Sequence, residues 1–91
     1  MTIESLRQKP VGVLEKRSII IKHKGKEYEE HYYLGKLDGD RYFVGFSDDG
    51  CYCSQMVSEN YMVHMINNKE SSDEEACDIY FQDPHLSCWI D

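Results

Sequence analysis

The sequence predicts an α+β domain: an antiparallel β-meander curled toward a small barrel, one short helix and a C-terminal β-hairpin. Two observations favour this fold class. Runs rich in β-branched and aromatic residues are separated by turn signals at Lys24-Gly25, Asp38-Gly39 and Asp48-Asp49-Gly50. After Ser58 the apolar residues change from alternation to helical spacing. With 91 residues the chain has room for one hydrophobic core, so we expect residues 1–91 to form a single domain.

The elements follow one another with short connections. A helical turn or two over Thr2–Gln8 is expected to end before Pro10, because the residue that precedes a proline disfavours the helical conformation. The meander follows, and its first segment is a weak strand. The expected strands are residues 11–14, 18–23, 28–37, 41–46 and 51–56.

The turns also predict which residues face each other. A two-residue turn at Lys24-Gly25 places Ile21 opposite Tyr28 and Lys22 opposite Glu27, both favourable pairs. Closing the next hairpins on Asp38-Gly39 and on a three-residue loop gathers aromatic and aliphatic side chains on one face. That predicted core face consists of Tyr33, Tyr42, Val44, Phe46, Tyr52 and Met56, with Tyr42 covering Gly35.

The opposite face of the predicted sheet is not polar. Its residues are Ile19, Ile21, Tyr28, Tyr32, Leu34, Phe43, Cys51 and Cys53. A flat sheet would leave this apolar surface in water, so either the sheet curls into a small barrel or the C-terminal segment covers it. The strong twist of a meander favours the barrel.

The remainder of the chain is predicted to be mixed. Ser58 is a suitable N-cap, so we expect a helix over residues 58–68, although Tyr61–Ile66 could instead form a fifth strand. Residues 69–75 are expected to be an acidic loop. Two strands, Cys77–Phe81 and Leu86–Ile90, are expected to form the C-terminal hairpin, with a turn at Asp83-Pro84.

Charge is segregated along the chain. Residues 1–37 carry eight Lys and Arg against five Glu, whereas residues 38–91 carry two Lys and Arg against twelve Asp and Glu, within a net charge of −7. Such a field repels nucleic acid and anionic membranes, and it attracts basic protein surfaces. Closely spaced carboxylates can also imitate a phosphate backbone. We expect the partner-binding residues to be Glu70, Asp73, Glu74, Glu75, Asp78 and Asp83, with Tyr80 and Trp89 as exposed aromatic anchors.

Other chemistries find less support. Five residues, Cys51, Cys53, Cys77, His85 and Cys88, could form a zinc site, but the chain has no Cys-x-x-Cys knuckle, so no metal or cofactor is expected. No phosphate-binding glycine motif or framed nucleophile occurs, so no enzymatic activity is expected. The basic stretch Lys16–Lys26, followed by Tyr28, Tyr32 and Tyr33, keeps a nucleic-acid-binding barrel open as the alternative.

These observations together predict a small acidic protein-binding module, a stoichiometric inhibitor or adaptor acting on a basic, nucleic-acid-binding protein. Apolar runs are short and the N-terminus has no apolar signal region, so we expect a cytoplasmic protein that does not enter membranes. The combination of small size, acidity and many tyrosines is typical of virus- and phage-encoded proteins that disable host machinery, anti-CRISPR proteins among them. In that case the setting is the host cytoplasm.

Overall fold

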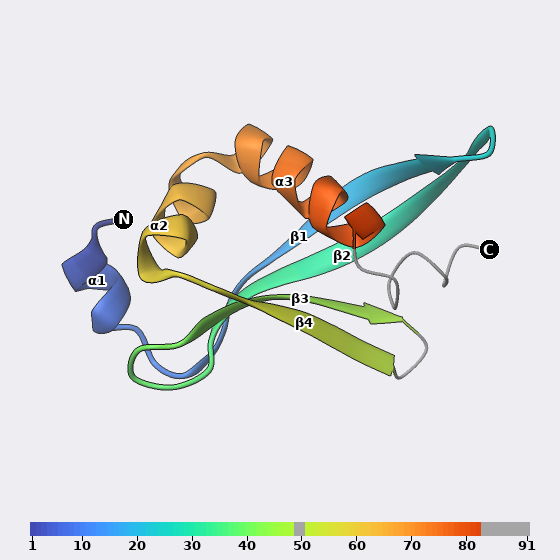
Figure 1. Ribbon diagram of the computed structural model, residues 1–91. Coiled ribbons are helices and arrows are strands. Elements are labelled where there is room, and N and C mark those ends of the chain that lie inside the picture. The colour runs from blue at the N-terminus through green and yellow to red at the C-terminus, as the bar shows by residue number, and fades with distance from the viewer. Residues whose placement is uncertain (49–50, 83–91) are drawn as a thin grey trace.

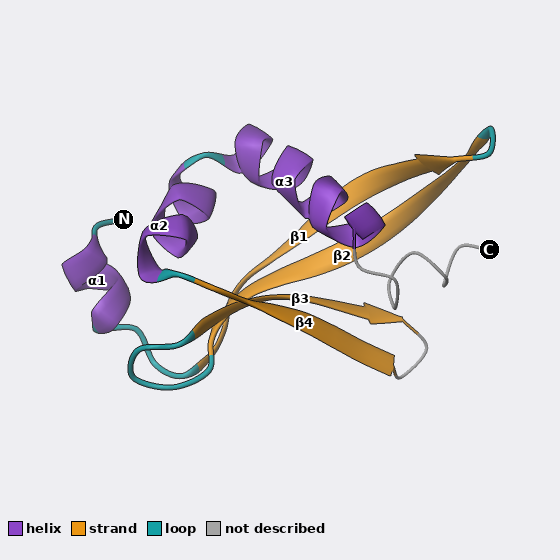
Figure 2. Cartoon of the chain, viewed as in Figure 1, coloured by secondary structure: helices purple, strands orange, loops and turns teal. Residues whose placement is uncertain are grey.

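An antiparallel sheet with helices on one face makes up residues 1–48 and 51–82, the part of the chain that the computed structural model describes. Helices α2 and α3 lie over the sheet, and α1 packs beside α2 (Figures 1 and 2). The elements are α1 (Ile3–Arg7), β1 (Gly12–His23), β2 (Lys26–Lys36), β3 (Tyr42–Asp48), β4 (Cys51–Val57), α2 (Glu59–Asn67) and α3 (Lys69–Gln82). The α+β class is thus confirmed.

The strands follow the order β1-β2-β3-β4, so the meander is also confirmed. Within the described residues β1 and β4 are the two edges and do not pair with each other, so the sheet is open rather than curled into a barrel. β2 pairs with β3 only over Tyr32–Lys36, and the two hairpins diverge beyond that segment (Figure 1). None of the helices in the described ranges has the length and apolar composition needed to cross a membrane.

The first hairpin has the predicted register. Ile21 faces Tyr28 and Lys22 faces Glu27 across the turn at Lys24-Gly25. Lys24 has a φ of 52° and Gly25 a φ of 76°, the left-handed pair that a two-residue hairpin turn requires. The two strands predicted at 11–14 and 18–23 form one strand, β1, with an irregularity between Val13 and Glu15.

The second and third hairpins are each shifted by one residue from the prediction. The connection between β2 and β3 is longer than Asp38-Gly39, because Leu37 N–H donates to Arg41 O at 2.8 Å. Leu34, rather than Tyr33, therefore faces Val44. Since one residue of slip turns a strand over, β2 presents Tyr32 and Leu34 to the core. In the same way Val57 rather than Met56 faces Tyr42, and Met56 is 47% exposed.

The core lies between the sheet and the helices. Tyr42, Val44 and Phe46 occupy it as predicted, whereas Tyr33 and Met56 do not. The side chain of Tyr52 lies outside those that the structure describes. Four residues predicted for the opposite face, Ile19, Ile21, Tyr32 and Leu34, are core residues. The buried hydrophobic residues are Leu6, Ile19, Ile21, Tyr32, Leu34, Tyr42, Val44, Phe46, Met62, Met65, Ala76, Ile79 and Tyr80.

Two buried cations attach the short helices to the sheet. Arg17 Nη1 donates to Met65 O at 2.7 Å and its Nη2 to Ile66 O at 3.1 Å, which satisfies carbonyl groups at the end of α2. Lys36 Nζ donates to Arg7 O at 2.8 Å and to Lys9 O at 3.0 Å beyond α1. These two side chains therefore act as helix caps and are not available to a ligand.

The C-terminal half is more helical than predicted. The helix after Ser58 is confirmed: the Ser58 side chain accepts a hydrogen bond from Tyr61 N at 3.1 Å, and α2 runs from Glu59 to Asn67. The acidic loop over residues 69–75 and the strand over residues 77–81 are wrong, since both segments belong to α3. Leu86–Ile90, the other strand of the predicted hairpin, lies outside the described residues.

The period of buried residues explains this helix. Ser72, Ala76, Ile79 and Tyr80 are buried at i, i+4, i+7 and i+8, which is one face of a helix. The strand prediction came from Cys77, Ile79 and Phe81 at alternate positions, and over so few residues a period of two cannot be separated from the helical period.

Candidate protein-binding site

The acidic segment of the sequence lies on α3, and its carboxylates divide into two groups. Glu70, Glu74 and Asp78 are all exposed, and their spacing at i, i+4 and i+8 places them in one row along the helix. We call these three residues the acidic ridge. Because a helix rises 1.5 Å per residue, the ridge presents a negative charge about every 6 Å. Phe81, 43% exposed, lies on the same side at the end of this row.

The second group consists of carboxylates that contact other side chains of the protein, and Asp73 is one of them. It accepts a hydrogen bond from the hydroxyl of the buried Tyr32, and Lys69 Nζ donates to it at 3.0 Å. The Tyr32 hydroxyl also lies 2.9 Å from Ser72 Oγ. Burial, and then the Asp73 carboxylate, raise the pKa of Tyr32 to about 12. Asp73, a predicted partner-binding residue, therefore connects α3 to β2 through its side chain.

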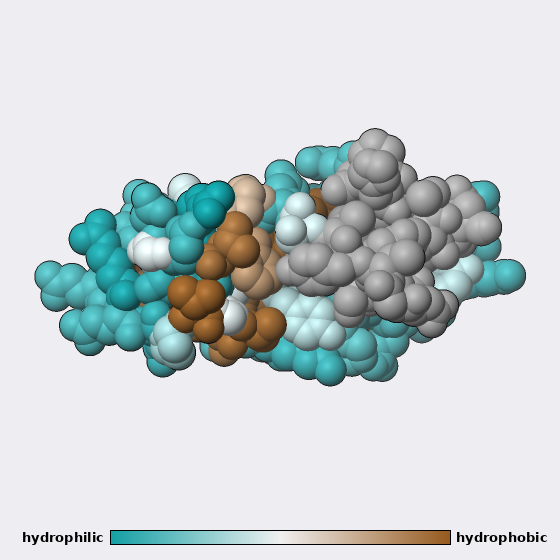
Figure 3. Space-filling view, turned by 90° about the horizontal axis from the view of Figure 1, so that it is seen from below, coloured by the Kyte–Doolittle hydropathy of each residue, from teal (hydrophilic) through white to brown (hydrophobic). Residues whose placement is uncertain are grey.

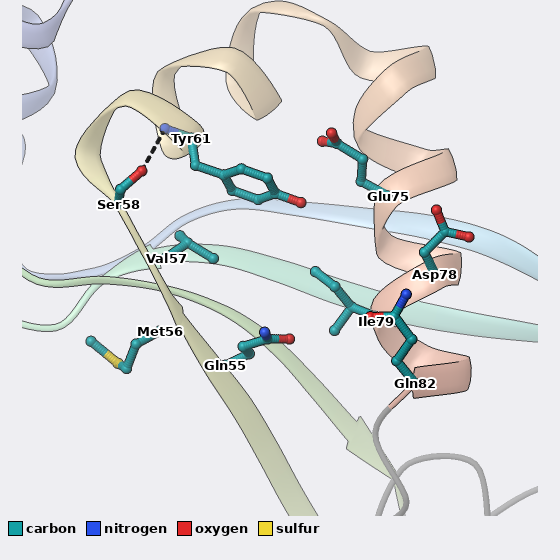
Figure 4. Close-up of a pocket in the computed structure, with 9 residues that line it drawn as sticks. All are labelled: Gln55, Met56, Val57, Ser58, Tyr61, Glu75, Asp78, Ile79 and Gln82. Atoms are coloured by element: carbon teal, nitrogen blue, oxygen red, sulfur yellow. Dashed lines mark hydrogen bonds between the residues drawn. The ribbon is translucent and has the colours of Figure 1, made fainter.

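Glu75 lies on the other side of α3 and is half-buried. Its Oε2 atom is 3.6 Å from His64 Nε2, and it is buried without a hydrogen-bond partner among the described residues. Tyr61 points from α2 toward Glu75 (Figure 4). Burial, and then the Glu75 carboxylate, raise the pKa of Tyr61. This oxygen of Glu75 is thus buried with the His64 ring nearby but without a hydrogen bond, an arrangement that favours an incoming cationic donor.

A groove separates this side of α3 from the edge strand β4. It has a volume of about 390 Å³ and lies between Gln55 and Val57 of β4 and the facing side of α3, with Tyr61 at one end (Figure 4). The α3 residues that line it are Glu75, Asp78, Ile79 and Gln82, spaced at i, i+3, i+4 and i+7. The groove combines an apolar base, an aromatic side chain and two carboxylates.

Of the two predicted aromatic anchors, the structure describes only Tyr80. Tyr80 is fully buried, and its ring packs edge-on against Phe46 at 5.5 Å between centroids, so it is a core residue and not an exposed anchor. Asp83 and Trp89 lie outside the described residues. Sequence reasoning missed Phe81 and Tyr61 as surface aromatics. Helical spacing from Glu70, Glu74 and Asp78 would have found Phe81.

The far face of the sheet carries an apolar row. Val13, Gly35, Phe43 and Met56 are successive partners across β1, β2, β3 and β4. A Cβ atom on Gly35 would lie 2.2 Å from Phe43 Cζ, so the ring covers the glycine backbone closely. The sequence predicted such a cover, but by Tyr42. Viewed from below, away from α2 and α3, apolar residues gather near the middle of the molecule (Figure 3).

Two of the residues proposed for the nucleic-acid-binding alternative have contacts within the fold. Of its proposed contact residues, Arg17 is bound to α2 and Tyr32 is buried in the core. Lys16 remains on the far face, with its Nζ 5.8 Å from the centroid of the Tyr33 ring. Lys22, Lys24 and Lys26 of the same stretch are also exposed, so nucleic-acid binding stays a prediction.

The structure describes only one of the side chains that were considered as zinc ligands, Cys77. Among the described residues no group of three or more His, Cys, Asp or Glu could hold a metal ion. Cys77 is a free thiol, and burial together with neighbouring carboxylates raises its pKa, which makes it less reactive. The side chains of Cys51, Cys53, His85 and Cys88 lie outside those described.

Comparison with protein-family models, with curated proteins and with solved structures finds no match for this chain. The function is therefore inferred from the chain's own residues.

Proposed function

We propose that this protein is a small acidic protein-binding module that acts as a stoichiometric inhibitor or adaptor on a basic, nucleic-acid-binding protein. The observation that carries the proposal is the acidic ridge: Glu70, Glu74 and Asp78 line the exposed side of a single helix. A rigid row of separate negative charges is what a phosphate backbone presents to a basic groove. No chemical step or cofactor is part of the proposed action.

The geometry supports this function in a second way. A helix holds its carboxylates in a fixed row before the partner binds. Binding therefore costs less conformational entropy than it would for a flexible acidic loop. Phe81 at the end of the ridge offers the aromatic contact that energetic anchors of interfaces commonly supply. Viral or phage origin, an anti-CRISPR-like role and action in the host cytoplasm remain the proposed biological setting.

Affinity capture tests the proposal. The tagged chain is used as bait in lysates of candidate hosts, with and without nuclease, and captured proteins are identified by mass spectrometry. We expect a basic nucleic-acid-binding protein that is retained after nuclease treatment, and a Glu70→Lys/Glu74→Lys variant that captures at least tenfold less. The matched control is Glu4→Lys/Asp40→Lys, which changes the net charge equally at exposed sites on α1 and on the connection between β2 and β3. Equal loss in both variants, or direct binding of oligonucleotides by the wild-type chain, would contradict the proposal.

A further inference from the structure

The free edge of β4 can be derived from the hydrogen-bond pattern of the neighbouring hairpin. Leu37 N–H donates to Arg41 O, so these residues form a hydrogen-bonded pair. Hydrogen-bonded and non-hydrogen-bonded pairs alternate in an antiparallel ladder, which makes Gly35 and Phe43 the next hydrogen-bonded pair. The backbone groups of Phe43 therefore point toward β2, and those of Val44 point the other way, toward β4.

The same alternation continues into β4. Val44 pairs with Gln55, so the N–H and C=O of Gln55 point back toward β3. Ser54 and Met56, on either side of it, direct their N–H and C=O outward. Among the described residues no backbone hydrogen bond reaches these groups. They form an edge to which another strand can pair, directly beside the groove.

The two edges of the sheet differ in how they are protected. Lys16 and Lys22, both exposed, lie along the edge of β1, and charged lysines are a common means of preventing edge pairing. The described edge residues of β4, Ser54 to Val57, carry no charge. On β4, therefore, no charged side chain among Ser54 to Val57 hinders pairing with an added strand.

We propose that the groove between β4 and α3 binds an extended basic peptide of the partner protein, by addition of a strand to β4. This proposal rests on the proposed function and specifies its contact. The peptide main chain would pair with Ser54 and Met56, and side chains on one side of it would enter the groove. Strand addition beside a helix is a general mode of peptide recognition in which the main chain gives affinity and the groove gives specificity.

Charge decides which side chains fit. Glu75 and Asp78 are three residues apart on α3, so their Cβ atoms are about 5–6 Å apart. Alternate residues of a strand are about 6.6 Å apart on one face, which matches this spacing. Arg or Lys at alternate positions would place a cation near each carboxylate, with its aliphatic stem on Val57 and Ile79 and its charge near the Tyr61 ring.

A second copy of this chain is the less suitable occupant. Pairing two β4 edges about a two-fold axis normal to the sheet would bring both α3 helices to the same side. The Glu75 and Asp78 carboxylates of one copy would then face those of the other, in a protein whose net charge is already −7. Like charges across an interface oppose association.

The test uses full-length, isotope-labelled protein and a synthetic peptide in which Thr and Arg alternate over seven residues, with blocked ends. We expect the amides of Ser54 and Met56 to shift and to exchange at least tenfold more slowly when the peptide is added, while that of Gln55 changes little. A peptide of the same composition with its three Arg residues in succession should bind about tenfold more weakly, because only one set of alternate positions faces α3.

Two sets of variants separate strand addition from simple charge attraction. N-methylation of the peptide at one set of alternate amides should abolish binding, and methylation of the other set should not. The protein variant Glu75→Gln/Asp78→Asn should bind about tenfold more weakly at low salt, whereas Glu70→Lys/Glu74→Lys should retain the Ser54 and Met56 protection at moderate salt. Equal binding by both methylated peptides, or no protection of Ser54 and Met56, would overturn the inference.

The remaining outcomes identify other occupants and also overturn it. Slow exchange of Ser54 and Met56 without peptide, independent of protein concentration, would show that the chain itself covers the edge. Protection that rises with protein concentration would show a second copy there. The proposed function is judged separately: partner capture that depends on Glu70 and Glu74 while the peptide leaves Ser54 and Met56 unprotected supports the ridge and refutes the groove.

Discussion

Replacing Tyr32 with phenylalanine removes one hydroxyl from the contact between β2 and α3. That hydroxyl lies 2.9 Å from Ser72 Oγ and donates to Asp73. A neutral hydrogen bond contributes about 1 kcal/mol to the free energy of unfolding, and one to a charged group about 1.5–3 kcal/mol. Asp73 keeps Lys69 and some access to water, and Ser72 can turn to a carbonyl of its own helix, so we expect a net loss of about 2–3 kcal/mol.

The assay is urea denaturation followed by circular dichroism at pH 7. At this chain length a loss of that size lowers the melting temperature by roughly 10–20 °C. The matched control is Tyr28→Phe, the same chemical change at a half-buried position of β2, which should alter the free energy of unfolding by less than about 0.5 kcal/mol. If Tyr32→Phe lost no more stability than Tyr28→Phe, the hydroxyl would not hold α3 to the sheet.

The pH dependence gives an independent check. The pKa of Tyr32 is raised to about 12 by burial and by Asp73, so the fold favours the protonated form. A tyrosine in the unfolded chain titrates near pH 10. The contribution is therefore fully present below about pH 10 and is lost as the pH rises through about 12. Two pKa units correspond to about 3 kcal/mol, and the gap between wild type and Tyr32→Phe should narrow over this interval. A gap that stays constant from pH 9 to pH 12 would contradict this linkage.

Two further changes test the packing of the sheet. Gly35→Ala should cost about 1–3 kcal/mol in urea denaturation, because the new Cβ would lie 2.2 Å from Phe43 Cζ, and Gly35→Ala/Phe43→Ala should lose less than the sum of the single changes. Additive losses would show that the ring does not cover the glycine. Arg17→Met should cost about 3–5 kcal/mol, because it removes two hydrogen bonds from a charged donor to Met65 O and Ile66 O, each worth about 1.5–3 kcal/mol; a loss below about 1 kcal/mol would mean that α2 does not need this cap.

The hairpins show where sequence reasoning reaches its limit. The turn at Lys24-Gly25 has two residues with positive φ, and a two-residue loop leaves only one register, so the pairs of β1 and β2 could be predicted. Asp38-Gly39 gave the same signal, but Leu37 and Arg41 close a longer loop around it. The Asp38 carboxylate accepts a hydrogen bond from Arg41 Nε across this longer loop. The Asp38-Gly39 pair by itself does not indicate this contact.

Slip by one residue accounts for the errors in the core. Tyr42, Val44 and Phe46 belong to β3 and keep their face under either register, whereas the residues of β2 and β4 change sides. Tyr33 and Met56 were therefore wrongly assigned to the core, and Tyr32 was wrongly assigned to the opposite face. The apolar character of both faces gave no reason to prefer one register.

The candidate site depends on the assignment of α3. The acidic residues were predicted to be a binding surface from charge alone, but a loop and a helix would present them differently. Ser72 is buried despite its polarity because Tyr32 supplies a partner, and no local pattern indicates a contact between residues 40 positions apart. Once Ser72, Ala76 and Tyr80 are placed on the buried face, Glu70, Glu74 and Asp78 follow on the exposed one.

The association rate with the captured basic partner tests the central claim most directly. It should be measured at low and at high salt for the wild type, for Glu70→Lys/Glu74→Lys and for the control Glu4→Lys/Asp40→Lys. We expect the ridge variant to associate about tenfold more slowly than the control at low salt, with the difference closing as salt rises, because the field of the ridge steers the encounter. Rates that are equal for the two variants in dilute buffer would show that the acidic ridge does not contact the partner.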